Sequence, residues 1–317
     1  MIKIMADSTC DLSQEILDKY DISLASLIVT IDGKEYRDRI DITPDVFYSM
    51  MEKLENPPTT AMPSPQAYIE IIDEAVKKGY TEILCICMSS GTSGAYQSAE
   101  LAKEYYFEEH PDSKLPIHIV DSKSMSHGTG WLIMKSARLR DQGATFEELI
   151  DFCETFKTNV KHYLSVDDLD HLIRSGRLSN TSAILGKLLK IKPIMSMKKG
   201  KGAIVAKERG RRKVLTHYVE EFKKRNDQDL TDFIIIGYTT DRTYAENLKL
   251  KLIEDTGFDG DIYIMQMGVA VGTHVGPGGV SLFFAEKDKL KDNMFLSEME
   301  PLIQKKNEFL EKFKNKK

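Results

Sequence analysis

Hydroxyl side chains and glycines are concentrated in the turn that follows a short apolar run, Ile83 to Met88. This turn, Ser89-Ser90-Gly91-Thr92-Ser93-Gly94, supplies four hydroxyls and two glycines, and a helical pattern follows it. A helix that begins directly after a buried strand points unpaired N–H groups, and the positive end of its dipole, at the carboxyl edge of the sheet. Together with the hydroxyls of Ser90, Thr92 and Ser93, these groups can bind an anion.

The missing motifs narrow the kind of anion. The chain contains neither G-x-x-x-x-G-K-[ST] nor G-x-G-x-x-G, and the turn has no lysine that could neutralise a polyphosphate. A small or singly charged group, such as a carboxylate, therefore suits the turn better. The alternative is that the serines only cap the following helix, because Ser and Thr are common caps.

Two other stretches carry side chains that suit the same chemistry. Four prolines stiffen residues 56–65 and can hold the hydroxyl of Thr60 in place, although this segment also reads as a surface linker. His274 stands among five glycines and a proline in residues 267–279. An imidazole held by so compact a backbone can donate to an anion or act as a base, and its alternative is a structural hydrogen bond.

The same residues also include the types needed for nucleophilic catalysis. Ser93 and His274, with Asp7 or Asp121, could serve as nucleophile, base and orienting carboxylate. However, the sequence around Ser93, Gly91-Thr92-Ser93-Gly94-Ala95, misses the G-x-S-x-G elbow by one position. A serine hydrolase or esterase that uses Ser93 and His274 is therefore the alternative function.

Basic residues are concentrated between Lys187 and Lys213, where eleven Lys or Arg stand against one acidic residue, Glu208. Such a cluster is either a solvated face or a surface for phosphate or for a carboxylate-rich partner. We do not expect nucleic-acid binding, because no aromatic residues interleave the cluster and the net charge of the chain is −5.

The composition is that of an ordinary globular protein. At 317 residues, with 41% hydrophobic and 29% charged residues, the chain fits two domains. Its start turns polar too early for a signal peptide, and no apolar run approaches the length that spans a membrane. We therefore expect a cytoplasmic protein. The cysteines lack metal-binding spacing, and we expect no metal and no cofactor.

The elements that must position these side chains follow a repeated pattern. At least three units of strand, polar turn and helix fall in the first 150 residues, with strands at Lys3 to Ala6, Ile83 to Met88 and Pro116 to Val120. This pattern predicts an α/β fold with a parallel sheet covered by helices, and ligands at the carboxyl ends of its strands. We expect an N-terminal α/β domain at 1–160, a second α/β domain at 161–285 and a helical tail at 286–317.

Further expectations concern single elements. A strand is predicted from Ile22 to Ile31, followed by a hairpin, and the first helix is capped by Asp11 or Ser13. In the second half, Asp167 or Asp168 caps a short helix, and another helix covers 182–190. Two short strands follow, 193–197 and 203–206.

Taken together, these stretches resemble the DegV family. The matching motifs occur in family order and span the chain to about residue 285. They are Asp7-Ser8-Thr9 with Asp11-Leu12, Thr60 with Pro63-Ser64, Ser89-Ser90 with Ser93-Gly94, Tyr96 and Gln97-Ser98-Ala99, Val120-Asp121-Ser122, Gly176-Arg177 with Ser179, Ile191-Lys192-Pro193, and Gly272-Thr273-His274-Val275-Gly276-Pro277-Gly278.

This resemblance implies a lipid-binding protein and not an enzyme. Members of the family bind a single long-chain fatty acid between two α/β domains. Those that act as subunits of bacterial fatty-acid kinase present the carboxylate to a separate kinase subunit, which forms an acyl phosphate with ATP. The resemblance thus implies a fatty acid and a kinase subunit as partners, a place in phospholipid synthesis and transient contact with a membrane.

The resemblance also assigns roles to individual residues. Thr60 and Ser93 would hold the carboxylate, with the amide of Gly94 and the imidazole of His274 nearby. The face offered to the kinase would carry four arginines, namely Arg177, Arg209, Arg211 and Arg212. The chain departs from the family pattern at Ala61-Met62 and at Thr92, where a leucine is usual, and these departures bear on acyl-chain preference.

Overall fold

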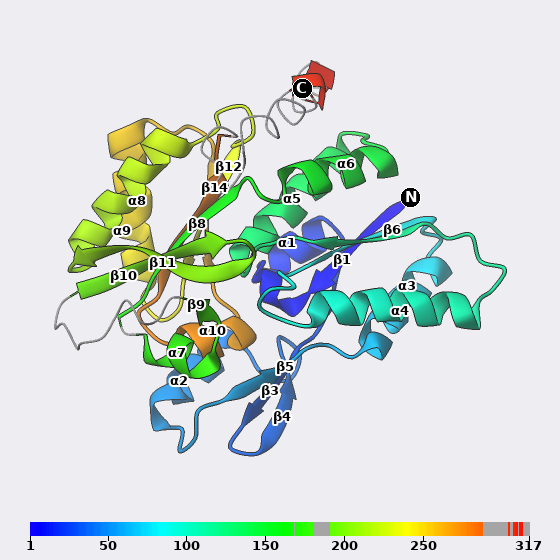
Figure 1. Cartoon of the computed structure of the whole chain (residues 1–317), viewed down its shortest axis with the longest axis horizontal. Helices are drawn as coiled ribbons and strands as arrows, with labels where there is room; N and C mark the ends of the chain where they lie inside the picture. Colours follow the sequence, from blue (N-terminus) through cyan, green and yellow to red (C-terminus); the bar gives the residue numbers. More distant parts are fainter. Residues whose placement is uncertain (168, 180–190, 288–303, 305–306, 310, 313–317) are drawn as a thin grey trace.

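The computed structural model describes residues 1–167, 169–179 and 191–287, together with 304, 307–309 and 311–312 of the tail. Three sheets and the helices packed on them make up this part of the chain (Figure 1). The expected helix at 182–190 and most of the expected helical tail at 286–317 lie outside the described residues.

The first sheet is parallel throughout, with strand order β2-β1-β6-β7. Its strands are β1 (Ile2–Asp7), β2 (Ile22–Ala25), β6 (Glu82–Cys87) and β7 (Ile117–Asp121). One face packs on α3 (Pro65–Lys77) and α4 (Ala95–Glu109), and the other on α1 (Gln14–Lys19), α5 (His127–Asp141) and α6 (Phe146–Phe156). The strands are apolar runs because helices cover both faces of the sheet. The predicted parallel sheet is confirmed.

A seven-stranded mixed sheet forms the second lobe, in the order β13-β12-β14-β8-β10-β11-β9. Its strands are β8 (Val160–Ser165), β9 (Leu178–Ser179), β10 (Ile191–Lys198), β11 (Lys201–Arg209), β12 (Phe233–Tyr238), β13 (Asp261–Gln266) and β14 (Val280–Ala285). One face packs on α8 (Arg211–Arg225) and α9 (Arg242–Thr256). The short helices α7 (Asp170–Ser175) and α10 (Val269–Val275) lie at its edge near the first lobe (Figure 1).

Helix α5 packs against both lobes. Its side chains contact β1 and β6 of the first sheet and also Phe233 and Phe283 of the second, in one continuous apolar core. The indole Nε1 of Trp131, which is fully buried, donates to the carbonyl of Phe233 at 3.2 Å. This helix therefore fixes the two sheets relative to each other.

The prediction of one strand from Ile22 to Ile31 was wrong. The chain leaves the first sheet after β2 and enters a separate antiparallel sheet of order β4-β3-β5, formed by β3 (Ile28–Ile31), β4 (Lys34–Arg37) and β5 (Thr59–Ala61). The break comes at Leu27, because its N–H donates to the Ser8 hydroxyl and its carbonyl accepts from the Asp38 N–H, so neither group pairs with a strand. The helix α2 (Pro44–Met50) and the 3₁₀ turns at Ser8–Cys10 and Met51–Lys53 complete this region.

Two cap predictions resolve differently. Ser13, not Asp11, caps α1, since its hydroxyl accepts from the N–H of Ile16. Asp167 does not cap α7, whose N-cap is Leu169, and Asp168 lies outside the described residues. The Asp167 carboxylate instead pairs with Lys192 and Arg211.

Strands β10 and β11 are longer than predicted, and β8, α8 and α10 were not predicted. The division of the chain near residue 160 stays a prediction.

One residue of the tail contacts the first lobe. Phe309 stacks on Phe152 of α6, with the two ring centroids 5.4 Å apart.

Candidate functional site

A cavity of about 380 Å³ lies between the two lobes. The first lobe contributes β5 and the turns after β6 and β7, and the second contributes β8, β10, β14 and α10. This volume is within the range of about 300–1,000 Å³ typical of small-molecule pockets. The turns that line it stand at the carboxyl ends of parallel strands, where the sequence predicted a ligand.

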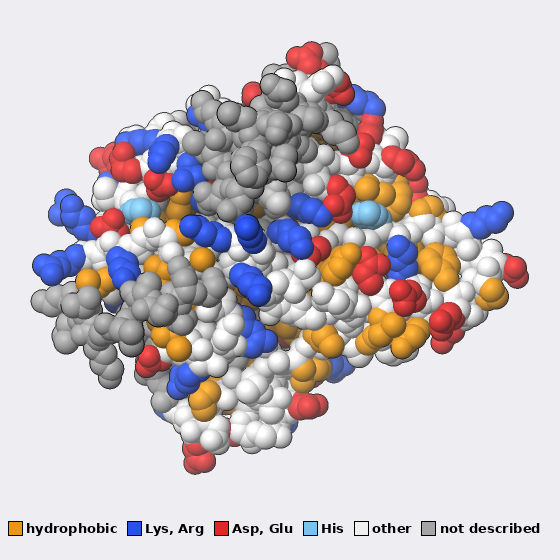
Figure 2. Space-filling view, viewed as in Figure 1, with side chains coloured by type: hydrophobic (Ala, Val, Ile, Leu, Met, Phe, Trp, Pro, Cys, Tyr) orange, Lys and Arg blue, Asp and Glu red, His pale blue; other side chains and the backbone are white. Residues whose placement is uncertain are grey.

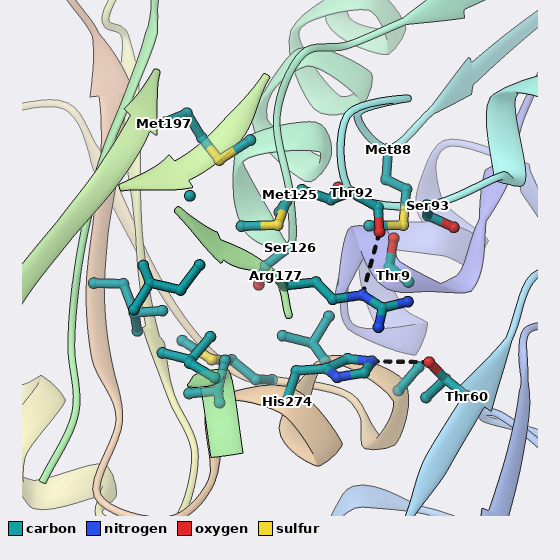
Figure 3. A pocket seen from close by; sticks show the side chains of 18 of the residues that line it. Thr9, Thr60, Met88, Thr92, Ser93, Met125, Ser126, Arg177, Met197 and His274 are labelled. Carbon is teal, nitrogen blue, oxygen red and sulfur yellow. Dashed lines mark hydrogen bonds between the residues drawn. The ribbon is translucent and has the colours of Figure 1, made fainter. Parts of the chain in front are cut away.

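Thr60 and His274 meet at one side of the cavity, where their side chains lie 2.8 Å apart between Oγ1 and Nε2 (Figure 3). Thr60 is not in a loop, as the prolines suggested, but in β5, where it pairs with Val29 of β3. His274 lies on α10, which the glycine-rich sequence concealed. Both residues line the cavity.

The imidazole of His274 is neutral at physiological pH. Burial, and to a lesser degree the charges of Arg177 and His171, lower the pKa of His274 to about 4. Its Nδ1 is buried and has no hydrogen-bond partner among the described residues. A neutral imidazole has one donor and one acceptor nitrogen, so a polar group of a ligand can pair with Nδ1.

Two buried carboxylates hold the beginning of α10. Asp11 Oδ1 accepts from the N–H of Gly268 at 2.8 Å, and its Oδ2 accepts from the hydroxyl of Ser126 at 2.5 Å. Asp38 accepts from the Ser8 hydroxyl at 2.7 Å and from backbone N–H groups of α10. Burial raises the pKa of Asp11 to about 8 and the pKa of Asp38 to about 6. These contacts tie the helix that carries His274 to the first lobe.

Ser93 and Gly94 stand where α4 begins, and both line the cavity. The Ser93 hydroxyl accepts from the N–H of Ala95 at 3.2 Å, but Ser93 is not the cap residue, because the N-cap of α4 is Gly94 and no side chain caps this helix. The alternative that Ser93 caps the helix was therefore wrong. Gly94 is covered by Met62, whose sulfur would clash with any added Cβ.

Arg177 is the one Lys or Arg among the described residues that line the cavity. Its Nε donates to the carbonyl of Thr92 at 3.4 Å and its Nη1 to the carbonyl of Ser175 at 2.5 Å. In Figure 3 its guanidinium lies between Thr92 and the His274–Thr60 pair. The resemblance to the DegV family implied that Arg177 lies on the face offered to a kinase, and that role stays a prediction; here its side chain also lines the cavity.

The other three arginines lie outside the cavity. Arg211 pairs with Asp167 and Asp241, each at 2.7 Å, while Arg209 and Arg212 are exposed. Lys and Arg side chains gather across the middle of the face in Figure 2. The exposed basic residues of the β10–β11 hairpin are Lys198, Lys199, Lys201, Lys207 and Arg209.

The residues of the hydrolase alternative are not assembled. Asp7 accepts from Thr9 and from the N–H of Met88, and Asp121 pairs with Ser90 and Lys123. In the described part of the chain, no hydrogen bond joins His274 to Ser93 or to a carboxylate. Within the same part, no group of three His, Cys, Asp or Glu could hold a metal ion.

The rest of the cavity wall is mainly apolar. Six methionines contribute to it, namely Met62, Met88, Met125, Met195, Met197 and Met267, with leucines, valines and Phe283 between them. Unbranched thioether side chains adapt their shape to what they contact. No local sequence pattern indicated this wall, because its residues come from strands and turns far apart in the chain.

Comparison with known proteins identifies the family. A family model described as "Uncharacterised protein, DegV family" matches residues 1–287. The chain belongs to the DegV family. Among curated DegV relatives, a DegV domain-containing protein of Clostridium acetobutylicum is 35% identical over 286 residues, which are 90% of this chain and 99% of the relative. A second, from Clostridium perfringens, is 35% identical over 284 residues, or 89% and 96%.

Solved structures of DegV proteins share the fold. A stearic acid-binding protein from Eubacterium ventriosum superimposes with a TM-score of 0.81 at 28% identity, covering 90% of this chain and 99% of that chain. A DegV family protein from Thermus thermophilus, described by its fatty acid binding, gives 0.80 at 26% identity with the same coverage. DegV from Bacillus subtilis, a fatty acid binding protein, superimposes with a TM-score of 0.78 at 26% identity, covering 90% of this chain and 99% of that chain. The predicted family and α/β fold are confirmed.

In the described part of this chain, no helix is long and apolar enough to cross a bilayer.

Proposed function

We propose that this DegV protein binds one long-chain fatty acid in the cavity between its lobes. The observation that carries the proposal is the Thr60–His274 pair beside Arg177 at one side of a mainly apolar cavity. Such a cavity suits a molecule with one acidic end and a long apolar remainder. Three DegV structures described as fatty-acid binding support this choice of ligand.

The carboxylate would accept hydrogen bonds from the hydroxyls of Thr60 and Ser93 and from the Gly94 amide, with His274 nearby. Since the imidazole is neutral and pairs with Thr60 through Nε2, its Nε2–H would donate to Thr60 Oγ1 and leave the Thr60 proton for the carboxylate. A carboxylate taken out of water needs a compensating charge, which the guanidinium of Arg177 would provide. Each charge-assisted hydrogen bond contributes roughly 1.5–3 kcal/mol. Each buried methylene contributes about 0.8 kcal/mol, so a chain of about sixteen carbons contributes more than the head group. The tail would therefore set affinity, and the polar residues would set orientation.

We further infer that the protein acts as a carrier, with no catalytic role of its own. A separate fatty-acid kinase subunit would convert the presented carboxylate to an acyl phosphate for phospholipid synthesis, in the cytoplasm where ATP is available. The exposed Arg209 and Arg212, with Arg211 beside them, suit an acidic partner surface. Collecting its ligand would require transient contact with a membrane.

Native mass spectrometry of the freshly purified protein tests the proposal. We expect a mass excess of one fatty acid per chain that disappears on denaturation, with the free acid recovered in the organic extract. A delipidated sample should regain one equivalent of stearic acid. If neither the purified protein nor the delipidated protein carries a fatty acid, the proposal is wrong.

A further inference from the structure

A second polar group lines the cavity on elements that carry none of the proposed carboxylate contacts. It consists of His162 on β8 and Ser281 on β14, which are 6% and 0% exposed. His162 Nε2 and Ser281 Oγ are buried and have no hydrogen-bond partner among the described residues. Buried polar atoms are nearly always paired, because an unpaired one keeps its full desolvation cost. The described part of the protein therefore supplies no hydrogen-bond partner for these two atoms.

The strand register places the two side chains on one face of the sheet. His162 stands opposite Phe283, and Ser281 opposite Leu164, in the antiparallel pair β8–β14. Ser281 and Phe283 are two residues apart and so share a face, which makes His162 and Ser281 diagonal neighbours. Such neighbours are about 7–8 Å apart. One small group between them can therefore reach both.

The surroundings of the pair favour an uncharged partner. Burial, with the nearby charge of Lys161, lowers the pKa of His162 to about 3, so its imidazole is neutral. The neighbouring lining residues Leu164, Phe283 and Met195 carry no charge. A neutral imidazole and a hydroxyl together offer both a donor and an acceptor. A hydroxyl group matches this set, whereas a second carboxylate would lack a compensating charge here.

We propose that the preferred ligand is an oxygenated long-chain fatty acid, whose acyl chain carries a hydroxyl that hydrogen-bonds to His162 and Ser281. This inference rests on the proposed function, since it assumes that the carboxylate binds at Thr60 and His274. It adds the chemical class of the acyl chain. The carboxylate site would then bind the acidic end of the ligand, and His162 with Ser281 would bind the hydroxyl on its acyl chain.

Competition between stearic acid and hydroxystearic acids tests the inference. Delipidated protein is incubated with stearic acid and one hydroxystearic acid at equal concentration, and native mass spectrometry gives the ratio of the two complexes. The series varies the carbon that carries the hydroxyl. We expect one or more isomers to be preferred over stearic acid by at least about two- to tenfold, which is the range of one net hydrogen bond.

Two variants of the pair and one control test whether His162 and Ser281 cause the preference for a hydroxystearic acid. Ser281→Ala should abolish or reverse it while stearic acid still binds, because the ligand hydroxyl would lose a partner and remain buried. His162→Leu should act in the same direction, and it supplies an independent result if one variant folds poorly. The matched control is Ser136→Ala in α5, where the hydroxyl is buried, donates to the Leu132 carbonyl and lies outside the cavity; it should keep the wild-type ratio.

The outcomes separate this inference from the proposed function. If stearic acid binds and every hydroxystearic acid binds equally or more weakly, the inner pair holds only water and the inference is overturned. A preference that persists unchanged in both pair variants also overturns it. If neither kind of acid binds, the proposed function fails and the inference fails with it.

Discussion

The hydroxyl of Thr60 and the Nε2 atom of His274 lie 2.8 Å apart although 214 residues separate them in the chain. Thr60 is fixed by its pairing in β5, and His274 by α10, so the contact joins a small sheet of the first half to the helix before β14. The polar side of the cavity is thus held in place by strand pairing and by a helix. Such preorganisation reduces the entropy lost on binding.

Replacing Thr60 tests this contact. Thr60→Val keeps the shape and removes the hydroxyl, so we expect affinity for stearic acid to fall about tenfold or more, as for loss of one hydrogen bond to a charged group. Thr60→Ser should retain most of the affinity. Calorimetric titration of delipidated protein measures both. Equal affinities of the Val and Ser variants would exclude Thr60 as a carboxylate ligand.

Ser93→Ala should weaken or misalign the carboxylate without unfolding the protein. Because the Ser93 hydroxyl also accepts from the N–H of Ala95, we expect a stability cost of about 0.5–1.5 kcal/mol, typical of one lost hydrogen bond. Denaturant titration gives this cost, and ligand titration gives the affinity. The wild-type protein should not react with a fluorophosphonate probe, and covalent labelling of Ser93 would favour a hydrolase instead.

Arg177→Met should reduce binding of stearic acid far more than binding of stearyl alcohol, which has the same chain and no charge. The reason is that methionine keeps much of the apolar stem but leaves the carboxylate without a compensating charge. Competition titrations with both ligands, in wild type and variant, give the difference directly. A similar loss for acid and alcohol would mean that Arg177 acts only by packing.

The pH dependence of stability tests the contact between Asp11 and α10. The pKa of Asp11 is raised to about 8, so the folded state keeps a proton that the unfolded chain releases, and the free energy of unfolding falls as pH rises through that window. Between pH 6.5 and 8 we expect the stability of wild type to fall by about 1.5 kcal/mol relative to that of Asp11→Asn, measured by denaturant titration. The buried His127, His162 and His274, whose pKa values are lowered, add stability over the same window in both proteins, and their contribution cancels in this difference.

Asp38→Asn is the control for that experiment. The pKa of Asp38 is raised only to about 6, so its effect falls mainly below the tested window. Wild-type and Asp11→Asn profiles that run parallel from pH 6.5 to 8 would show that Asp11 is already ionised in the folded protein.

The sequence predicted local elements well and their breaks poorly. The apolar run of β6 and the polar turn after it were recognised because they form one continuous pattern. The separation of β2 from β3 was missed, since it depends on bonds from Leu27 to Ser8 and Asp38 that only the folded chain reveals. Helix α10 was missed because its glycines mask the helical period.

The candidate site was predicted in its parts but not in its assembly. Thr60, Ser93, Gly94 and His274 all line one cavity, and their roles there stay predictions. The sequence alone did not bring Thr60 to His274, because strand pairing in β5 decides that approach. It gave no sign of His162 and Ser281, whose common face depends on the register of β8 with β14.

The position of α5 between the two sheets limits how the molecule can open (Figure 1). Parting the lobes along α5 would expose a continuous apolar core, and parting α10 from β3 and α2 would expose a second apolar cluster. Strand β5 and the turn before α4 meet the second lobe at the edge of the cavity through the hydrogen bonds Thr60–His274 and Arg177–Thr92. We therefore expect the ligand to enter between β5 and this turn, while α5 stays in place. A fatty acid would then enter tail first and leave its acidic end nearest the exit, within reach of whatever docks there.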